Sequence, residues 1–175
     1  MALHSKKIKP KFIKLKILKS KNISKKYLLW LNDKEVTKHT DLIFEKHTYN
    51  SIKKYVSQMY KDKNNYLYGI FYQNKHIGNM KVGPILKPHK TAYISYLIGD
   101  KNMWNKGIGT IIIKLIKKIC KKKHKLIKIN AGVSELHKPS QLVLLKNGFK
   151  FEGDFKKQIV FKNKRYSLLK YGCIL

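Results

Sequence analysis

The stretch from Tyr96 to Cys120 constrains the fold of this chain more than any other part of the sequence. An apolar run ends at Gly99, and Gly107 and Gly109 follow where a chain leaving a strand would begin a helix. Small residues at this point let backbone N–H groups approach an anion, and the helix dipole favours negative charge there. The stretch therefore predicts a strand, a glycine loop and a helix, with a loop suited to bind a pyrophosphate.

Hydrophobic periodicity predicts the remaining elements. After the loop, Ile112, Leu115, Ile116 and Ile119 recur at helical spacing, which is typical of an amphipathic helix lying on a sheet. Alternating or β-branched runs predict strands, and Ser24, Thr48 and Gly148 supply helix-end signals. We expect strands at 12–19, 66–72, 76–82, 92–98, 126–133, 158–161 and 166–171, and further helices at 24–31, 48–61 and 140–147. Gly83-Pro84 is expected to end one hairpin, and a last hairpin is expected from Phe149 onward with its turn at Asn163-Lys164.

This order of elements predicts one α/β (α+β) domain over residues 1–175, with helices on both faces of a mixed sheet. The 175 residues are enough to bury roughly 70% of the surface of the unfolded chain. No internal repeat or low-complexity linker indicates a second domain.

The net charge is unusual. Forty Lys and Arg residues against nine Asp and Glu residues give a formal charge of +31, which attracts polyanions in a salt-dependent way. However, Arg165 is the only arginine, and the lysines are spread along the whole chain. The bidentate groups that read guanine are therefore nearly absent, and we expect no specific nucleic-acid partner.

Cys120 and Cys173 are the only cysteines, which are too few for a disulfide framework and are not spaced as metal ligands. Residues 1–26 contain no apolar run of signal-peptide length, and no stretch has the roughly 18 apolar residues of a membrane span. The sequence therefore predicts a cytoplasmic protein with no metal and no integral membrane contact, although its charge alone permits visits to an anionic membrane surface.

Three motifs carry a family resemblance. Trp30–Val36 matches a W-x-N-D-x-E-V pattern, Trp104–Gly109 matches [Q/R]-x-x-G-x-[G/A] except at its first place, and His137–Ser140 with Gly148-Phe149 matches N-x-x-S followed by G-F except at His137. With these motifs the chain resembles the GNAT superfamily of N-acetyltransferases, in the branch of the ribosomal-protein alanine acetyltransferases. The resemblance covers nearly the whole chain and implies a mostly antiparallel central sheet.

The resemblance also implies acetyl-CoA as the cosubstrate. Its pyrophosphate is expected on the N–H groups from Asn105 to Thr110, its pantetheine arm beside the strand end, and its 3′-phosphate near Lys106. A backbone N–H near Leu97 is expected to stabilise the oxyanion. The implied cofactor-binding residues are Tyr96, Leu97, Ile98, Trp104, Asn105, Lys106, Gly107, Ile108, Gly109, Thr110 and His137.

Ser140 and Glu45 are the catalytic candidates. Ser140 occupies the serine position of the motif and is either the acid that protonates the leaving thiolate or the N-cap of a helix after Pro139. Leu144 stands where family members that use a tyrosine acid carry it, so that role is not transferred. A base or a water relay is needed to deprotonate the amine, and the acidic candidates are Asp33, Glu35, Asp41, Glu45 and Glu135. We favour Glu45, with His47 beside it, and its alternative is a solvated loop residue. His137 either caps a strand end or contacts the cofactor arm.

The acceptor is not specified by the motifs. Gly78–Pro84 resembles a segment of acetyltransferases from surface-polysaccharide pathways, and the positive charge favours an acceptor that bears phosphates. These features favour a nucleotide-linked amino sugar or another small amine. One alternative is a protein N-terminus, as the branch name implies, and another is a basic nucleic-acid-binding protein without enzymatic activity. We expect a monomer or a homodimer.

Overall fold

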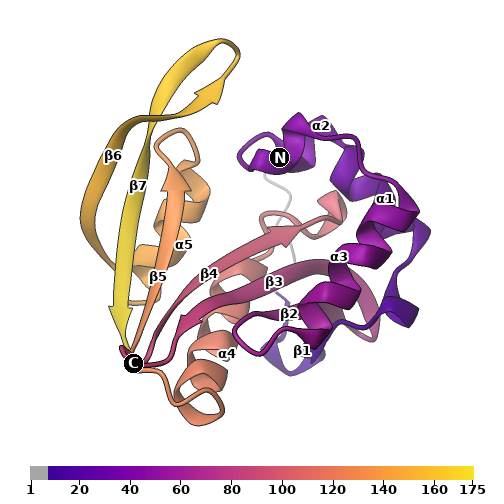
Figure 1. Ribbon diagram of the computed structural model, residues 1–175, viewed down its shortest axis with the longest axis horizontal. Coiled ribbons are helices and arrows are strands. Elements are labelled where there is room, and N and C mark those ends of the chain that lie inside the picture. Colours follow the sequence, from indigo (N-terminus) through magenta and orange to yellow (C-terminus); the bar gives the residue numbers. More distant parts are fainter. Residues whose placement is uncertain (1–7) are drawn as a thin grey trace, which may run out of the picture.

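A seven-stranded sheet forms the centre of the computed structural model, which describes residues 8–175 (Figure 1). The strand order is β1-β2-β3-β4-β5-β7-β6, and all neighbours are antiparallel except β4 and β5. The mixed, mostly antiparallel sheet is therefore confirmed. The strands are β1 (Ile13–Ile17), β2 (Tyr66–Tyr72), β3 (Lys75–Leu86), β4 (Thr91–Ile98), β5 (Lys128–Ser134), β6 (Lys150–Phe161) and β7 (Lys164–Ile174).

Helices cover both faces of the sheet, as the sequence predicts. On one face Leu67 of β2 packs with residues of the first three helices, and on the other Tyr68 packs with residues of the last two. The α-helices are α1 (Lys25–Asn32), α2 (Lys34–Thr37), α3 (Tyr49–Lys61), α4 (Ile108–Lys122) and α5 (Lys138–Lys146). No helix within residues 8–175 has both the length and the apolar character needed to cross a membrane.

Several helix ends have the predicted chemistry. The Ser24 hydroxyl accepts the Tyr27 N–H at the start of α1, and the Thr48 hydroxyl accepts the Ser51 N–H at the start of α3. Gly148 follows α5 with a φ of +82° and donates its N–H to the Leu145 carbonyl oxygen. These short-range patterns were readable because each depends on residues only a few positions apart.

Three predicted boundaries are wrong. The strand predicted at 76–82 continues as β3 to Leu86, because a register shift between Val82 and Ile85 lets pairing resume past Pro84. The last hairpin turns at Lys162 and Asn163, where both residues have positive φ. Its strand β6 begins at Lys150, which agrees with the hairpin predicted from Phe149 onward but not with the strand bound predicted at 158. Two register shifts interrupt its pairing with β7.

The sheet opens between β4 and β5. These strands pair in parallel only from Thr91 to Tyr93 and from Lys128 to Asn130. Both strands then continue, β4 toward Ile98 and β5 toward Ser134, and they diverge from each other (Figure 1). Beyond Tyr93, β4 therefore has an edge that no neighbouring strand covers, and this edge determines where the site lies.

Candidate active site

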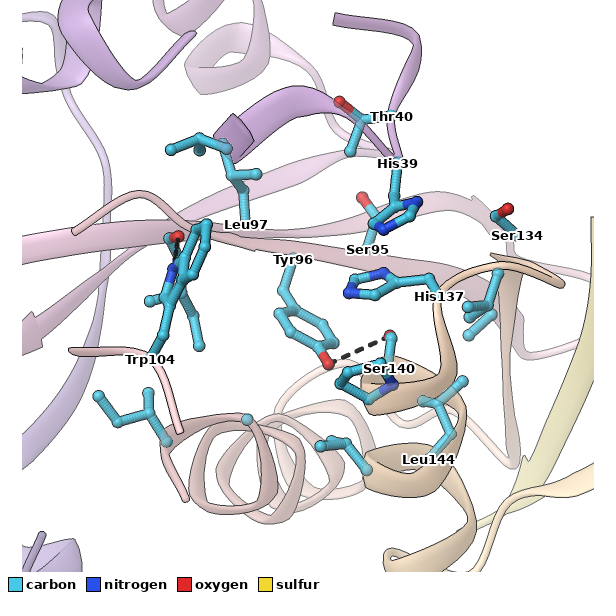
Figure 2. A pocket seen from close by; sticks show the side chains of 18 of the residues that line it. His39, Thr40, Ser95, Tyr96, Leu97, Trp104, Ser134, His137, Ser140 and Leu144 are labelled. Atoms are coloured by element: carbon cyan, nitrogen blue, oxygen red, sulfur yellow. Dashed lines mark hydrogen bonds between the residues drawn. The ribbon is translucent and has the colours of Figure 1, made fainter. Parts of the chain in front are cut away.

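A cleft of about 560 Å³ lies where β4 and β5 diverge. Its walls come from the ends of these two strands, the first turns of α4 and α5, and the segment that follows α2. Figure 2 shows Tyr96, Trp104, His137 and Ser140 around this cleft, with His39 approaching from the segment after α2. The first part of the Tyr96–Cys120 stretch, from Tyr96 to Gly109, thus contributes to the lining of the cleft.

The loop before α4 brings a helix N-terminus to the cleft. Asn105 and Gly107 adopt left-handed φ values of 58° and 77°, and Gly107 is the N-cap of α4. The first N–H groups of a helix have no intrahelical acceptor, and glycine has no side chain with which to cap them. A Cβ on Gly109 would lie 3.1 Å from Val143 Cγ2, so this turn packs closely against α5. The loop can therefore offer several N–H groups to an anion.

The uncovered edge of β4 presents backbone groups to the cleft. The Gly99 N–H donates to the Ile77 carbonyl oxygen of β3 over 2.9 Å. Because successive residues of a strand direct their backbone N–H and C=O groups to opposite edges, those of Tyr96 and Ile98 face away from β3 and toward the cleft. A hydrogen bond supports this orientation, because the Trp104 Nε1–H donates to the Ile98 carbonyl oxygen over 2.7 Å. The N–H expected near Leu97 is thus refined to Tyr96, since the backbone of Leu97 faces β3.

Tyr96 and Ser140 bring two hydroxyl groups together. The Tyr96 hydroxyl lies 3.2 Å from Ser140 Oγ (Figure 2), and Ser140 is 7% exposed. Burial raises the pKa of Tyr96, and the Ser140 hydrogen bond only partly offsets that rise. Ser140 is not the N-cap of α5, because the helix begins at Lys138 with His137 as its N-cap. The N-cap alternative for Ser140 is therefore wrong, and its hydroxyl contacts Tyr96 in the cleft instead.

Sequence reasoning found no tyrosine acid because it looked for one on α5. Leu144 occupies that helix position and is buried at 1% exposure. The hydroxyl near Ser140 instead comes from β4, where Tyr96 shares the α4 face with Ile94. Strand alternation was the available signal, since it places Tyr96 on the face that α4 covers.

His39 and His137 form a stacked pair in the cleft. Their ring centroids are 4.3 Å apart with an angle of 17° between the planes, and Phe161 lies 6.3 Å from His39. Burial, with smaller contributions from His39 and Lys38, lowers the pKa of His137 to about 4. Burial and then Lys38 also lower the pKa of His39. Both rings are therefore neutral bases near pH 7. No local motif marks His39, and sequence reasoning missed it.

The motif from Trp30 to Val36 anchors the wall that carries His39. Trp30 is buried at 8% exposure, and the Asp33 carboxylate caps α2 by accepting the Glu35 N–H over 2.9 Å. Lys101 Nζ lies 2.8 Å from Asp33 Oδ2 and 2.9 Å from Glu35 Oε2. These ion pairs connect α2 to the segment that follows β4.

Glu45 lies apart from this site. It is exposed and borders a second hollow with Leu42 and Lys46, whereas the Ser140 hydroxyl lines the main cleft. The ring of the neighbouring His47 contacts the Leu42 carbonyl oxygen over 3.1 Å. The structure therefore does not bring Glu45 together with Ser140, and its position corresponds to the solvated alternative.

Most of the predicted cofactor-binding residues border the cleft. The lining includes Tyr96, Leu97, Ile98, Trp104, Asn105, Gly107, Ile108, Gly109 and His137. Lys106 lies in the same loop and Thr110 in the first turn of α4, but neither belongs to the lining. Lys106 and Thr110 can therefore contact only those groups of the cofactor that extend outside the cleft.

Comparisons with known proteins agree with this geometry. A family model described as an acetyltransferase (GNAT) domain matches residues 15–168. The fold is similar to that of a ribosomal alpha-N-protein acetyltransferase, RimL, solved with coenzyme A, with 19% identity, 94% of each chain covered and a TM-score of 0.83. It is also similar to spermidine N-acetyltransferase from Vibrio cholerae, solved with CoA and spermine, with 14% identity, 94% of this chain and 96% of that chain covered and a TM-score of 0.84.

A third solved structure has the same fold. It is an acetyltransferase from Salmonella typhimurium that modifies the N-terminal serine of a ribosomal subunit protein, with 18% identity, 94% of this chain and 95% of that chain covered and a TM-score of 0.78. At these identities the likeness of the three structures establishes a shared fold.

Proposed function

The chain belongs to the GNAT family of acetyltransferases, and we propose that it transfers an acetyl group from acetyl-CoA to the primary amine of a small molecule in the cleft between β4 and β5. One observation carries this proposal. The uncovered edge of β4 ends beside the helix that begins at Gly107. Backbone groups of a strand that can pair with an extended ligand therefore lie next to a helix end that can bind an anion.

The residues present fit coenzyme A. The first N–H groups of α4 suit a pyrophosphate, and the backbone of Tyr96 suits an amide of the pantetheine arm. The Ile98 carbonyl oxygen is already occupied by the Trp104 indole, which leaves Tyr96 as the open position on this edge. When bound, acetyl-CoA supplies an activated acyl thioester.

Tyr96 and Ser140 then act at the acyl-transfer end of the cleft. The Tyr96 N–H faces the cleft and can stabilise negative charge that develops on the carbonyl oxygen. Burial keeps the Tyr96 hydroxyl protonated, and this hydroxyl contacts Ser140 Oγ. We assign Ser140 as the group that protonates the leaving sulfur, with Tyr96 as the partner that supplies and orients its proton.

For the acceptor we propose an amino sugar carried on a nucleotide. The net charge of +31 favours an acceptor with phosphates and opposes a polycation such as spermidine. The cleft itself contributes little negative charge, since Glu35 is paired with Lys101. The second candidate is a protein N-terminus, which is favoured by the fold shared with RimL.

Incubation of the purified protein with acetyl-CoA and a panel of acceptors tests the proposal. The panel contains nucleotide amino sugars, N-terminal peptides and spermidine, and free thiol is measured over time. We expect the fastest thiol release with a nucleotide amino sugar and the slowest with spermidine. Binding of coenzyme A is measured separately by calorimetry. Absence of thiol release with every acceptor, together with absence of coenzyme A binding, would contradict the enzymatic proposal.

A further inference from the structure

An aliphatic amine arrives at the cleft as an ammonium ion near neutral pH and must lose a proton before its nitrogen can attack. The titratable side chains that line the cleft are those of Glu35, Lys38, His39, Tyr96 and His137. Lys38 carries the same charge as the ammonium, and the hydroxyl of Tyr96 stays protonated. Among the side chains that line the cleft, this leaves Glu35 and the two histidines as proton acceptors.

Glu35 is a poor candidate. Its carboxylate lies 2.9 Å from Lys101 Nζ, and its side chain is 56% exposed. The same lysine also holds Asp33, so a proton transferred to Glu35 would weaken a bridged ion pair. Glu35 also lies on α2, whereas the acyl-transfer end is formed by Tyr96 of β4 and Ser140 of α5.

We propose that the stacked His39–His137 pair is the proton acceptor for the incoming amine, an inference that rests on the function proposed above. Figure 2 shows the His137 ring between His39 and the Tyr96 ring, and Ser140 lies beside Tyr96. Both rings therefore line the same cleft as the two hydroxyls that we assign to protonation of the sulfur. An amine placed between the histidine pair and the thioester gives its proton to the histidine pair. The sulfur receives a proton from the Ser140–Tyr96 pair.

The proposed step is balanced in protons and electrons. An unprotonated ring nitrogen of the pair takes one proton from the ammonium group, which leaves a lone pair on the amine nitrogen. This lone pair forms the new C–N bond, and the C–S bond breaks with its electrons moving to sulfur. The nitrogen of the new amide loses its second proton, the sulfur takes a proton through Ser140, and the proton from nitrogen restores the Ser140–Tyr96 pair. The proton held by the imidazole pair passes to solvent. The products are an amide and a free thiol.

The stacking makes the two rings act as one base. Charge on one ring opposes charge on the other at a centroid distance of 4.3 Å, so the pair takes up one proton at a time. Lys38 adds positive charge from the end of α2, and Glu35 lies on the same side. Glu135, two residues before His137, accepts the Ser167 N–H of β7 at its Oε1. Phe161 of β6 lies near the His39 ring and carries no charge.

Two amines distinguish a base from a structural element. Ethanolamine is protonated at neutral pH, whereas trifluoroethylamine is largely unprotonated and does not need a base. We expect His39→Gln and His137→Gln to lower turnover of ethanolamine by about 100-fold, and the double variant to lose little more, because the rings act as a unit. Turnover of trifluoroethylamine should fall by no more than about threefold, and raising the pH should restore ethanolamine turnover.

Matched variants complete the test. His89→Gln changes an exposed histidine in the turn before β4 and should leave both rates unchanged. Coenzyme A binding and thermal unfolding, measured on each variant, identify losses that come from a damaged cleft. Equal losses with both amines, or a larger selective loss in Glu45→Gln, would overturn the assignment to the histidine pair. If the unaltered enzyme acetylates neither amine nor any member of the acceptor panel, the proposed function fails and this inference fails with it.

Discussion

The hydroxyl of Tyr96 and Oγ of Ser140 lie 3.2 Å apart although they are separated by 44 positions in the chain. One comes from the uncovered end of β4 and the other from the first turn of α5. Both line the cleft that forms where β4 and β5 diverge. Position 144 carries leucine where some family members carry a tyrosine, and here the hydroxyl beside Ser140 comes from Tyr96 of β4.

Tyr96→Phe and Ser140→Ala should each lower kcat without abolishing coenzyme A binding. Loss of a general acid typically costs about 10²- to 10⁴-fold, and we expect the lower end because the other hydroxyl remains. Because the two hydroxyls form one pair, the double variant should resemble the more damaged single variant. Thiol release under saturating acetyl-CoA measures the effect.

Tyr93→Phe is the matched control for Tyr96→Phe. It removes a hydroxyl from the same strand at a residue that is 40% exposed and does not line the cleft. Its kcat should equal that of the unaltered enzyme. A Ser140→Ala enzyme with unchanged turnover would remove the acid role from Ser140.

The loop before α4 should be sensitive to side chains at its glycines. Gly107→Ala and Gly153→Ala both place a Cβ on a residue with positive φ and with no atom within 4 Å of that Cβ. Each should cost about 1 kcal/mol of unfolding free energy because of the left-handed backbone. Only Gly107→Ala should also weaken coenzyme A binding, since it changes the N-cap of α4.

Gly109→Glu should remove coenzyme A binding altogether. Its side chain would meet Val143, and its negative charge would occupy the end of α4 that suits an anion. Calorimetry with coenzyme A measures all three glycine variants. Equal weakening by Gly107→Ala and Gly153→Ala would show that general destabilisation, and not the loop, explains the loss.

Lys106→Glu should raise the KM for acetyl-CoA by about 3- to 10-fold at low salt and by less at high salt, because screening weakens the contact between exposed charges. The reason is the expected pairing of Lys106 with the 3′-phosphate. Lys63→Glu, on the exposed connection before β2, makes the same change in net charge far along the chain and serves as the control. The same KM increase in both variants would assign the effect to net charge alone.

The folded state should lose stability as the pH falls from about 6.5 toward about 4. The folded protein holds the pKa of His137 at about 4 through burial, below the ordinary value of 6.5. Between these values the unfolded chain binds more protons than the folded chain, so acid favours unfolding. Burial lowers the pKa of His76 and His124 in the same direction.

Urea unfolding of the unaltered protein and of His137→Gln across this pH range measures the contribution of His137. The variant should show a shallower decline in unfolding free energy, whereas His89→Gln should follow the unaltered protein. A decline of the same slope in His137→Gln would contradict the contribution of that residue.

The sequence by itself determined the features that depend on neighbouring residues. Glycine at 107 starts a helix whose apolar stripe of isoleucines lies on the sheet, and Ser24 and Thr48 cap their helices. Alternation along β4 also contains the information that Tyr96 lies on the face that α4 covers, although our prediction from the sequence did not use it. These features follow from backbone geometry and hydrophobic period, which act over a few residues.

Tertiary structure alone decided which side chains meet in the cleft. The stack of His39 on His137 brings the segment after α2 against the residue that precedes α5. Glu45 instead borders a separate hollow that is lined only by residues 31–46. Such meetings depend on how distant segments pack, and no local pattern of residues encodes the distance between two helix ends.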